Sequence, residues 1–422
     1  MNTISKIFRG DKVIWVLFMF FCFISLIEVY SASSTLTFRN SYWLPILKHA
    51  VFLLLGTGMV LVVHNIKPKY FSLLMVGLPV SWGLLILVKL LGDTTNDAAR
   101  WLEVGGFTFQ PSEMAKLCLI ATTAFILSKQ ADSKNNKAFR WIVGLSIATC
   151  AFIFTENFST AALLFIVVYL MMFVGQVPLK KIGLLTVSLI GILALFIAFL
   201  LLAPDSMLEK FNRGETWKNR FLNFSEAKAE LNPDTYVIND DNFQRSHAQI
   251  AISEGGIFGK LPGNSTQRDV LPQAYSDFIY AIIIEEMGLV GALAVLFLYI
   301  ILLVRAGQIA SRCEKLFPKY LVLGSSLLIV MQALSNMAVA VGLIPITGQP
   351  LPLISKGGTS IIITCVYIGI ILSVSRFENP KGIQTEEAIA AELAEQEQLS
   401  GEKPFWDGEP ALQEQTVKPE ET

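Results

Sequence analysis

Long apolar runs recur along most of the chain and restrict the fold more than any other feature. A helix needs about 20 apolar residues to cross the hydrocarbon core of a bilayer. Ten runs approach this length, at residues 13–30, 44–64, 70–91, 111–128, 140–155, 158–175, 182–203, 278–304, 320–344 and 358–375. The sequence therefore predicts an all-α polytopic membrane protein with about ten transmembrane helices. The stretch "TENFS" between the fifth and sixth runs is either a tight turn or a break within one longer element.

Composition agrees with a membrane protein and excludes several other classes. Of the 422 residues, 53% are hydrophobic and 16% are charged, which is too apolar for a soluble domain. The net charge of −1 provides no basic field for a nucleic acid. The five cysteines are odd in number and show no CxxC spacing, and the three histidines are scattered. Both patterns argue against a disulfide framework and a zinc site.

Basic residues orient the predicted helices. With the N-terminus placed inside, the inner segments hold seventeen Lys and Arg residues, whereas the short outer loops hold three: Arg39, Arg100 and Lys356. By the positive-inside rule, both termini are cytoplasmic. The basic start and apolar run 13–30 resemble a signal peptide, but the run is long for one and we expect it to be retained as the first helix.

Two polar segments set the domain organisation. Residues 1–376 form the predicted transmembrane domain, which includes a large extracytoplasmic loop at 204–276. That loop is too long to be a mere connector, and long ordered loops are usually functional. Residues 377–422 hold twelve acids against three lysines, which predicts a disordered cytoplasmic tail to which we assign no chemistry.

The first polar stretch at the outer face is "RWLEVGGFTFQPSEMAK", residues 100–116. Pro111 suits the first turn of a helix, because its missing N–H would be unpaired there anyway. Glu113 and Lys116 lie three residues apart on one helical face and can form an ion pair. That pair either holds the bundle together or belongs to the functional site, since charges inside a membrane are functional candidates.

The second stretch is "LPQAYSDFIYAIIIEE", residues 271–286. Asp277 lies where a helix starts, so free N–H groups and the helix dipole favour its ionised form. The alternative is that Asp277 simply caps that helix. A continuous helix would place Glu285 and Glu286 about 12–14 Å deeper. Each of the two needs an internal partner, such as Lys116, so we expect them to form structural ion pairs.

The third stretch is "NMAVAVGLIPITGQPLPLISKGGTS", residues 336–360. Its three prolines and several glycines interrupt the helical pattern at the outer end of the ninth run. Irregular backbone at membrane depth is tolerated where it is buried in protein or lines a cavity. Lys356 either meets a pyrophosphate or is a lysine whose charge reaches the interface.

Familiar nucleotide and hydrolase motifs are missing from the sequence. We find no GxxxxGK[ST], HExxH or GxSxG motif, and no dinucleotide fingerprint. We therefore expect a substrate that arrives already activated or that moves down a gradient. From the residues alone, an enzyme and a transporter remain equally consistent with the pattern.

The three stretches together resemble the SEDS family (shape, elongation, division, sporulation) over residues 13–376. The carriers are "RWL…FQPSEMAK", "WKNR", "GNS…LPQAYSDFIYA…EE" and "N…GLIPITGQPLPLISKGGTS". The last two are closer to the division members than to the elongation members. The chain departs from the family at Lys356, where Tyr is common, and at "ENFST", where "PDLGT" is common.

The resemblance implies a peptidoglycan glycosyltransferase of the bacterial inner membrane that acts at the septum. Such proteins polymerise lipid II, a disaccharide-pentapeptide on undecaprenyl pyrophosphate, beside a class B penicillin-binding protein and other divisome proteins. Asp277 matches the family's essential acid, and we expect it to act as general base in an inverting reaction. A divalent cation, Mg²⁺ or Mn²⁺, is compatible with this chemistry. The alternatives are a lipid II flippase and a non-catalytic division scaffold.

The expected substrate-binding residues lie on the predicted outer side or in the fourth helix. They are Arg100, Glu113, Lys116, Trp217, Arg220, Ser265 and Lys356. The cations of this set would stabilise a leaving pyrophosphate.

Overall fold

The structure is a computed structural model of the whole chain. It describes residues 8–32, 43–91, 93–95, 98–104, 107–130, 137–154, 156–202, 218, 238–239 and 242–378, and the statements below concern these residues. Trp217, Arg220 and the acidic tail from residue 379 lie outside them, as does most of the loop at 204–237.

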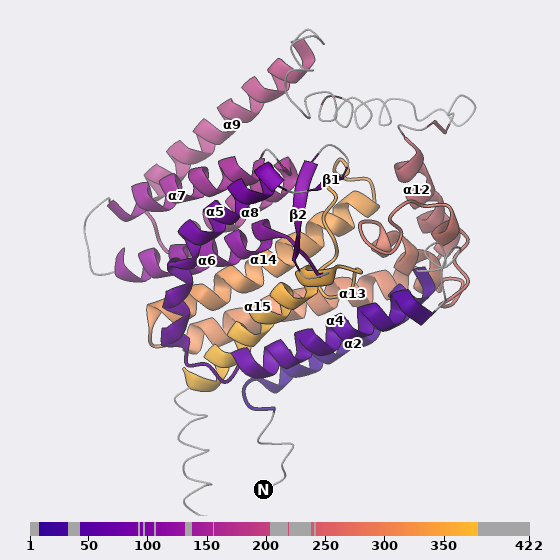
Figure 1. Cartoon of the computed structure of the whole chain (residues 1–422), viewed down its shortest axis with the longest axis horizontal. Coiled ribbons are helices and arrows are strands. Elements are labelled where there is room, and N and C mark those ends of the chain that lie inside the picture. The colour runs from indigo at the N-terminus through magenta and orange to yellow at the C-terminus, as the bar shows by residue number, and fades with distance from the viewer. Residues whose placement is uncertain are drawn as a thin grey trace, which may run out of the picture. The chain divides into compact units, whose positions relative to one another are not determined.

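Long helices account for every predicted membrane span (Figure 1). They are α2 (Lys12–Ala32), α4 (Trp43–Val63), the bent pair η1 (Pro68–Met75) and α5 (Gly77–Leu91), α6 (Pro111–Gln130), α7 (Lys137–Phe154), α8 (Phe158–Val174), α9 (Leu179–Leu202), α13 (Ile279–Arg312), α14 (Leu316–Ala340) and α15 (Gly358–Phe377). Among the described residues, seven of these helices are long and apolar enough to cross a membrane, or eight with the pair bent by 45°. The helical fold class is confirmed.

The remaining two of the ten predicted spans, α8 and α6, fall outside this count because of their length and polarity. Helix α8 is apolar but has 17 residues. Helix α6 has 20 residues, and most of its polar side chains are buried against other helices. The "TENFS" stretch is a turn, because Asn157 precedes α8 and its side chain accepts a hydrogen bond of 3.2 Å from the N–H of Thr160.

Three short strands lie between α5 and α6. β1 (Asp93–Thr95), β2 (Ala98–Val104) and β3 (Phe107–Phe109) form an antiparallel arrangement in the order β1-β2-β3. They connect α5 to α6. The Thr359 hydroxyl at the start of α15 donates to the Thr108 carbonyl at 3.0 Å, so β3 lies beside α15.

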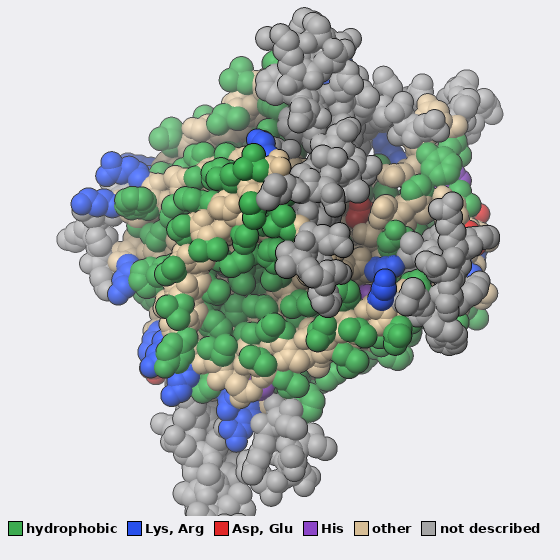
Figure 2. Space-filling view, in the orientation of Figure 1, with side chains coloured by type: hydrophobic (Ala, Val, Ile, Leu, Met, Phe, Trp, Pro, Cys, Tyr) green, Lys and Arg blue, Asp and Glu red, His purple; other side chains and the backbone are tan. Residues whose placement is uncertain are grey.

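Burial differs sharply between the apolar helices. In α14 and α15, 67% of the apolar window is buried, whereas in α9 only 6% is. Figure 1 shows α9 extending away from the other helices. Figure 2 shows a broad hydrophobic face with Lys and Arg side chains along its left and lower border. A hydrophobic face bordered by cations on one side is typical of a membrane protein.

Helix α13 is two helices joined at Gly288, whose φ of 67° and ψ of −168° are not helical. The break arises from a close backbone approach by the segment that follows α12 (Phe243–Gly255). A Cβ on Gly288 would lie 2.2 Å from the Ile257 carbonyl oxygen, and one on Gly259 would lie 2.2 Å from the Glu286 carbonyl oxygen. Both positions therefore require glycine.

Four backbone hydrogen bonds hold this approach together. The N–H groups of Lys260 and Leu261 donate to the carbonyls of Glu285 and Glu286 at 2.9 and 2.8 Å. In return, the N–H groups of residues 289 and 290 donate to the carbonyls of residues 256 and 257 at 3.0 and 3.2 Å. The part of α13 before Gly288 is thus hydrogen-bonded to the segment that follows α12. It does not continue straight into the rest of α13.

Candidate active site

Asp277 lies in the turn that leads into α13 and is half-buried. The Ser276 hydroxyl donates to its Oδ1 at 3.0 Å. The cap position of α13 belongs to Phe278, and no side chain caps the helix there. Asp277 therefore does not occupy the cap position that was considered for it.

The irregular loop between α14 and α15 is fastened to the residues around Asp277. The Asn336 amide of α14 donates to the Asp277 carbonyl and to the Gln349 carbonyl, both at 2.8 Å. The Ser355 hydroxyl donates to the Ser276 carbonyl at 2.6 Å. The second and third polar stretches of the sequence therefore form one site, as their shared position at the outer face suggested.

A cation and an aromatic ring border the same space. The Lys356 Nζ lies 5.0 Å from the centre of the Tyr275 ring, and the Lys356 N–H donates to the Tyr275 carbonyl at 2.9 Å. Burial, and then the nearby charge of Lys48, lowers the pKa of Lys356 below its usual value. Burial, and then the charge of Asp277, raises the pKa of Tyr275. Lys48 was not predicted, because a lysine at the edge of an apolar run usually reaches toward the interface.

Gly348 lies directly beside the Asp277 carboxylate. Its φ is 65°, and a Cβ built on it would lie 3.5 Å from the Asp277 Oδ2. A larger residue at 348 would be strained and would crowd the carboxylate. The sequence signal for this feature was the glycine within "ITGQP".

The ion pair of α6 is buried and connects to this loop. The Lys116 Nζ lies 2.8 Å from the Glu113 Oε1, and the Lys116 side chain is 0% exposed. The same ammonium donates to the Gln332 Oε1 at 3.3 Å, and the Gln332 amide donates to the Pro350 carbonyl at 3.2 Å. Glu113 and Lys116 thus position the loop opposite Asp277, and their binding of substrate stays a prediction.

Glu285 forms a structural ion pair, but with a partner other than the one expected, whereas among the described residues Glu286 accepts hydrogen bonds from Ser31 and Ser265 and has no ion pair. The Lys260 ammonium lies 2.8 Å from the Glu285 Oε1, which also accepts the Thr266 N–H at 2.8 Å. Lys116 is not their partner, because the break in α13 keeps both acids beside the extracytoplasmic loop segment. The hydrogen bonds that the Lys260 ammonium donates to the Glu254 and Glu285 carboxylates raise the pKa of Lys260.

Two further residues were expected to bind substrate. Ser265 belongs to a different cluster, and the side chain of Arg100 lies outside the described part. The Ser265 hydroxyl, 4% exposed, donates to the Glu285 carboxylate and is part of that structural cluster. The substrate contact predicted for Ser265 stays a prediction. The backbone of Arg100 lies in β2, while its side chain is outside the described part.

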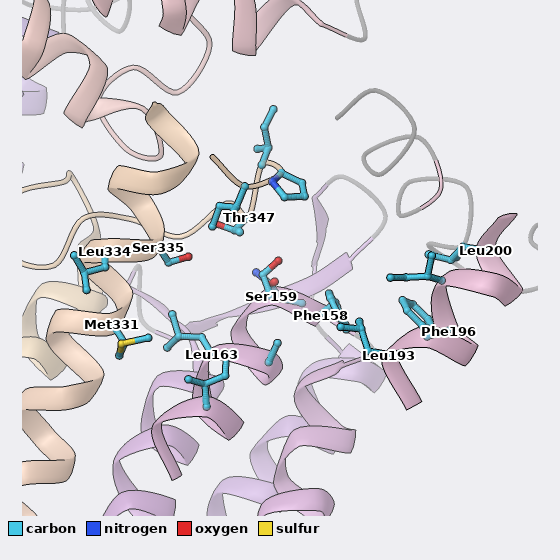
Figure 3. A pocket seen from close by; sticks show the side chains of 17 residues that line it. Phe158, Ser159, Leu163, Leu193, Phe196, Leu200, Met331, Leu334, Ser335 and Thr347 are labelled. Carbon is cyan, nitrogen blue, oxygen red and sulfur yellow. The ribbon is translucent and has the colours of Figure 1, made fainter. Parts of the chain in front are cut away.

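An apolar cavity of about 500 Å³ opens between α8, α9 and α14 (Figure 3). Its walls include Phe158, Leu163, Phe196, Met331 and Ser335. Thr347 of the irregular loop also lines it and directly precedes Gly348, the residue in front of Asp277. The separation of α9 from the bundle leaves this cavity between the helices, which hydropathy could not reveal.

A metal ion would need several ligating side chains that lie close together. Among the described residues, no group of three or more His, Cys, Asp or Glu side chains is placed to hold a metal ion. All five cysteines are free thiols in the structure. Mg²⁺ is often held by one or two carboxylates together with substrate phosphates. Asp277 fits that limited role.

Comparison with known proteins identifies the family. The profile of the FtsW/RodA/SpoVE family, described as "Cell cycle protein", matches residues 11–380. The chain belongs to this family. The resemblance to SEDS proteins, which include FtsW and RodA, is therefore confirmed over most of the chain.

Two relatives that carry the name FtsW agree with the expected similarity to the division members of the family. A probable peptidoglycan glycosyltransferase FtsW of Marinobacter nauticus is 34% identical over 352 residues, covering 80% of this chain and 82% of the relative. One of Geobacter sulfurreducens is 30% identical over 386 residues, covering 88% and 97%. Both are FtsW proteins by name.

Solved structures share the fold. The rod shape determining protein RodA of Thermus thermophilus has a TM-score of 0.62 and 23% identity, covering 87% of this chain and 97% of that one. A chain described under "Structural coordination of polymerization and crosslinking by a peptidoglycan synthase complex" has a TM-score of 0.69 and 22% identity, covering 88% and 99%.

The Asn336 contacts lead to a prediction about positioning within the FtsW/RodA/SpoVE fold. In Asn336→Ala, the Asp277 and Gln349 carbonyls both lose their donor. We expect turnover to fall roughly 10- to 100-fold, equivalent to 1–3 kcal/mol, while substrate binding changes less. The measurement is steady-state glycan synthesis, with kcat and KM determined separately.

A matched control lies on the same helix. Ser326→Ala removes a hydroxyl that bonds within α14, to the Leu323 carbonyl. Equal losses in the two variants would show that Asn336 acts through helix stability and not through the position of Asp277.

Proposed function

We propose that this chain is a peptidoglycan glycosyltransferase that polymerises lipid II at the outer face of the bacterial inner membrane during division. The observation that carries the proposal is the Asp277 carboxylate. It is half-buried and lies beside Gly348, and the backbone of residues 276 and 277 is hydrogen-bonded by Asn336 and by Ser355, a residue of the loop that contributes Lys356. The relatives named probable peptidoglycan glycosyltransferase support the same activity.

Asp277 acts as the general base. The donor is a glycan whose reducing-end sugar carries undecaprenyl pyrophosphate, and the acceptor is the 4-hydroxyl of GlcNAc on incoming lipid II. Forming a β-1,4 bond from an α-linked pyrophosphate inverts the anomeric carbon, so a single displacement with one base is sufficient. Asp277 takes the acceptor proton as the new C–O bond forms, and pyrophosphate leaves with the electron pair of the broken bond.

Cations stabilise the departing pyrophosphate. Lys356 is the described cation nearest to this chemistry, and Lys48 contributes a second charge close to it. Arg100 and Arg220 remain further candidates on the outer side. Where a divalent cation, Mg²⁺ or Mn²⁺, takes part, Asp277 and the substrate phosphates would hold it, and it would neutralise negative charge.

The cavity between α8, α9 and α14 accommodates part of the lipid tail. Its walls are almost entirely apolar, and it reaches the loop beside Asp277 at Thr347. A polyprenyl chain gains free energy by burying its methylene groups in such a cavity. A substrate held there by its tail would present its pyrophosphate near Asp277 and Lys356.

The partner is a class B penicillin-binding protein, with other divisome proteins around it at the septum. Structural similarity to a chain of a peptidoglycan synthase complex supports a partner synthase. The net charge of −1 gives no reason to expect a nucleic acid.

One experiment separates the proposed enzyme from the alternatives. The purified chain is reconstituted with lipid II, with and without its transpeptidase partner, and both polymer and lipid translocation are measured. Glycan strands made under these conditions support the enzyme. Translocation without polymer would identify a flippase, and the loss of both with intact partner binding would identify a scaffold.

The lowered pKa of Lys356 predicts a specific alkaline limit. Because burial disfavours the ammonium, Lys356 loses its charge at lower pH than an ordinary lysine. Activity should therefore decline earlier at alkaline pH, and Lys356→Arg should move that decline to higher pH. Tyr275 does not cause the decline, because its pKa is raised. Identical alkaline profiles for the two proteins would exclude Lys356 from the reaction.

A further inference from the structure

Glu28 is a buried acid in α2 that the proposed reaction does not use. Its side chain is 0% exposed, and the residue lies in the last turns of the helix, near the predicted outer face. Neither carboxylate oxygen has a hydrogen-bond partner among the described residues. An ionised carboxylate without partners in an apolar interior is strongly unfavourable, so this group requires an explanation.

A second acid lies near Glu28, because Ser31, one helical turn further along α2, donates a hydrogen bond to Glu286 of α13. Glu286 is also 0% exposed, and its charge acts on Glu28. Its Oε1 accepts hydrogen bonds from the Ser31 hydroxyl and, at 3.3 Å, from the Ser265 N–H, and the Gly263 N–H also stabilises this carboxylate. Its Oε2 has no partner with hydrogen-bond geometry in the described part of the chain. Three carboxylate oxygens at one buried position therefore lack donors.

The surrounding charges balance one ionised acid, not two. Arg268 attracts the Glu286 carboxylate and donates to the Ser31 hydroxyl and carbonyl at 3.1 and 3.3 Å. Lys260 and Glu285 already neutralise one another at 2.8 Å. With Arg268 opposite Glu286, the second acid has no counter-charge.

Groups on the other packed helices do not supply that charge. His49 of α4 accepts or donates a hydrogen bond with Ser25 at 2.8 Å, one turn along α2 from Glu28. In α15, the charged residue is Arg376, in the last turn at the opposite end. When two neighbouring buried carboxyls have one counter-ion between them, the ionised form of the second is strongly disfavoured, so one of the two holds a proton.

We propose that Glu28 and Glu286 form a proton-binding site, with the proton held on Glu28 and directed toward the free Oε2 of Glu286. The site joins α2 to the segment that contains Ser265 and Arg268. A metal ion fits the same position poorly, because the described residues offer two carboxylates and the guanidinium of Arg268 repels a cation. Protonation of Glu28 removes the negative charge that would otherwise repel Glu286 and separate α2 from this segment.

The site has a structural consequence at the outer face. Glu286 lies in the short helical part of α13 before Gly288, which begins directly after Asp277 and Phe278. Joining Glu28 to Glu286 therefore holds α2 against that part of α13. This inference concerns a proton and not catalysis, so it goes beyond the proposed function.

The test compares two amide substitutions by infrared difference spectroscopy at neutral pH. Glu28→Gln should remove the carbonyl stretch of a protonated carboxylic acid, because the wild-type proton is on Glu28. Glu286→Gln removes the ionised partner, and a carboxylic acid band should remain. Glu314→Gln, an exposed acid, is the control and should leave the band unchanged. An absent acid band in wild type would overturn the proposal.

Stability provides a second readout that does not depend on activity. An amide resembles a protonated acid, so Glu28→Gln should retain the wild-type Tm, whereas Glu286→Gln should lower it. The folded wild type holds a proton that the unfolded chain releases, so its stability falls as pH rises, by at most tenfold in the unfolding constant per pH unit. That slope should be missing in Glu28→Gln.

Two other outcomes would contradict the proposal. If Glu28→Gln lowers Tm as much as Glu286→Gln, both carboxylates are needed as anions and the proposal fails. A rise of wild-type Tm with Ca²⁺ or Mg²⁺ that Glu28→Gln abolishes would identify a metal site instead. Neither readout depends on glycan synthesis. The proton-binding site and the proposed function can therefore be refuted independently of one another.

Discussion

Asp277→Asn should insert and fold normally but lose glycan polymerisation by about 10²- to 10⁴-fold, the range for removing a general base. Asparagine has the shape of aspartate and can keep the Ser276 contact of 3.0 Å as an acceptor. The Asn336 and Ser355 bonds reach the backbone of residues 277 and 276, so they persist in the variant. The loss would therefore report the missing proton acceptor and not a displaced loop.

The measurement is polymer formation from lipid II by the reconstituted protein with its partner, together with a partner-binding assay. Asp269→Asn is the matched control, because Asp269 is an acid in a neighbouring extracytoplasmic turn with a side chain 50% exposed. Wild-type turnover in Asp277→Asn would remove the base assignment. A loss shared by both variants would point to a general electrostatic effect.

Breaking the ion pair of α6 should give the largest loss of stability. In Lys116→Met, the buried Glu113 carboxylate keeps its place without its partner at 2.8 Å. Removing one member of a buried pair costs about 3–5 kcal/mol, because the other charge is left uncompensated. Gln332 would also lose its donor from Lys116, which weakens the connection to the Pro350 carbonyl.

The double variant Glu113→Gln with Lys116→Met removes both charges. We expect it to recover most of the lost Tm, since a neutral pair carries no isolated charge. Thermal unfolding in detergent measures all three variants, and Lys129→Met, at an exposed site on the same helix, is the control. Additive losses in the double variant would mean that the pair is not coupled.

Particular residues show how far sequence reasoning reached. The convergence of Asp277 with the loop that contains Lys356 could be predicted, because both stretches belong to the outer ends of helices. The partners of Glu285 could not, because they depend on whether α13 is straight. Gly288 and Gly259 allow two backbones to approach, and that approach breaks the helix and brings Lys260 to Glu285.

Residues without an unusual pattern were missed for a related reason. Asn336 and Gln332 are ordinary polar residues within an apolar helix, and their importance comes from the carbonyls that they reach. Glu28 was likewise absorbed into the first apolar run. Its significance arises from Glu286, which is distant in sequence and adjacent only after folding.

The sequence by itself determined the number and position of the long helices, because bilayer thickness sets the length of each apolar run. It also determined which acids and cations stand at the outer ends. Tertiary structure alone decided the break in α13, the cavity beside α9 and the partner of every buried charge. Those features depend on contacts between segments far apart in the chain, which local hydropathy does not encode.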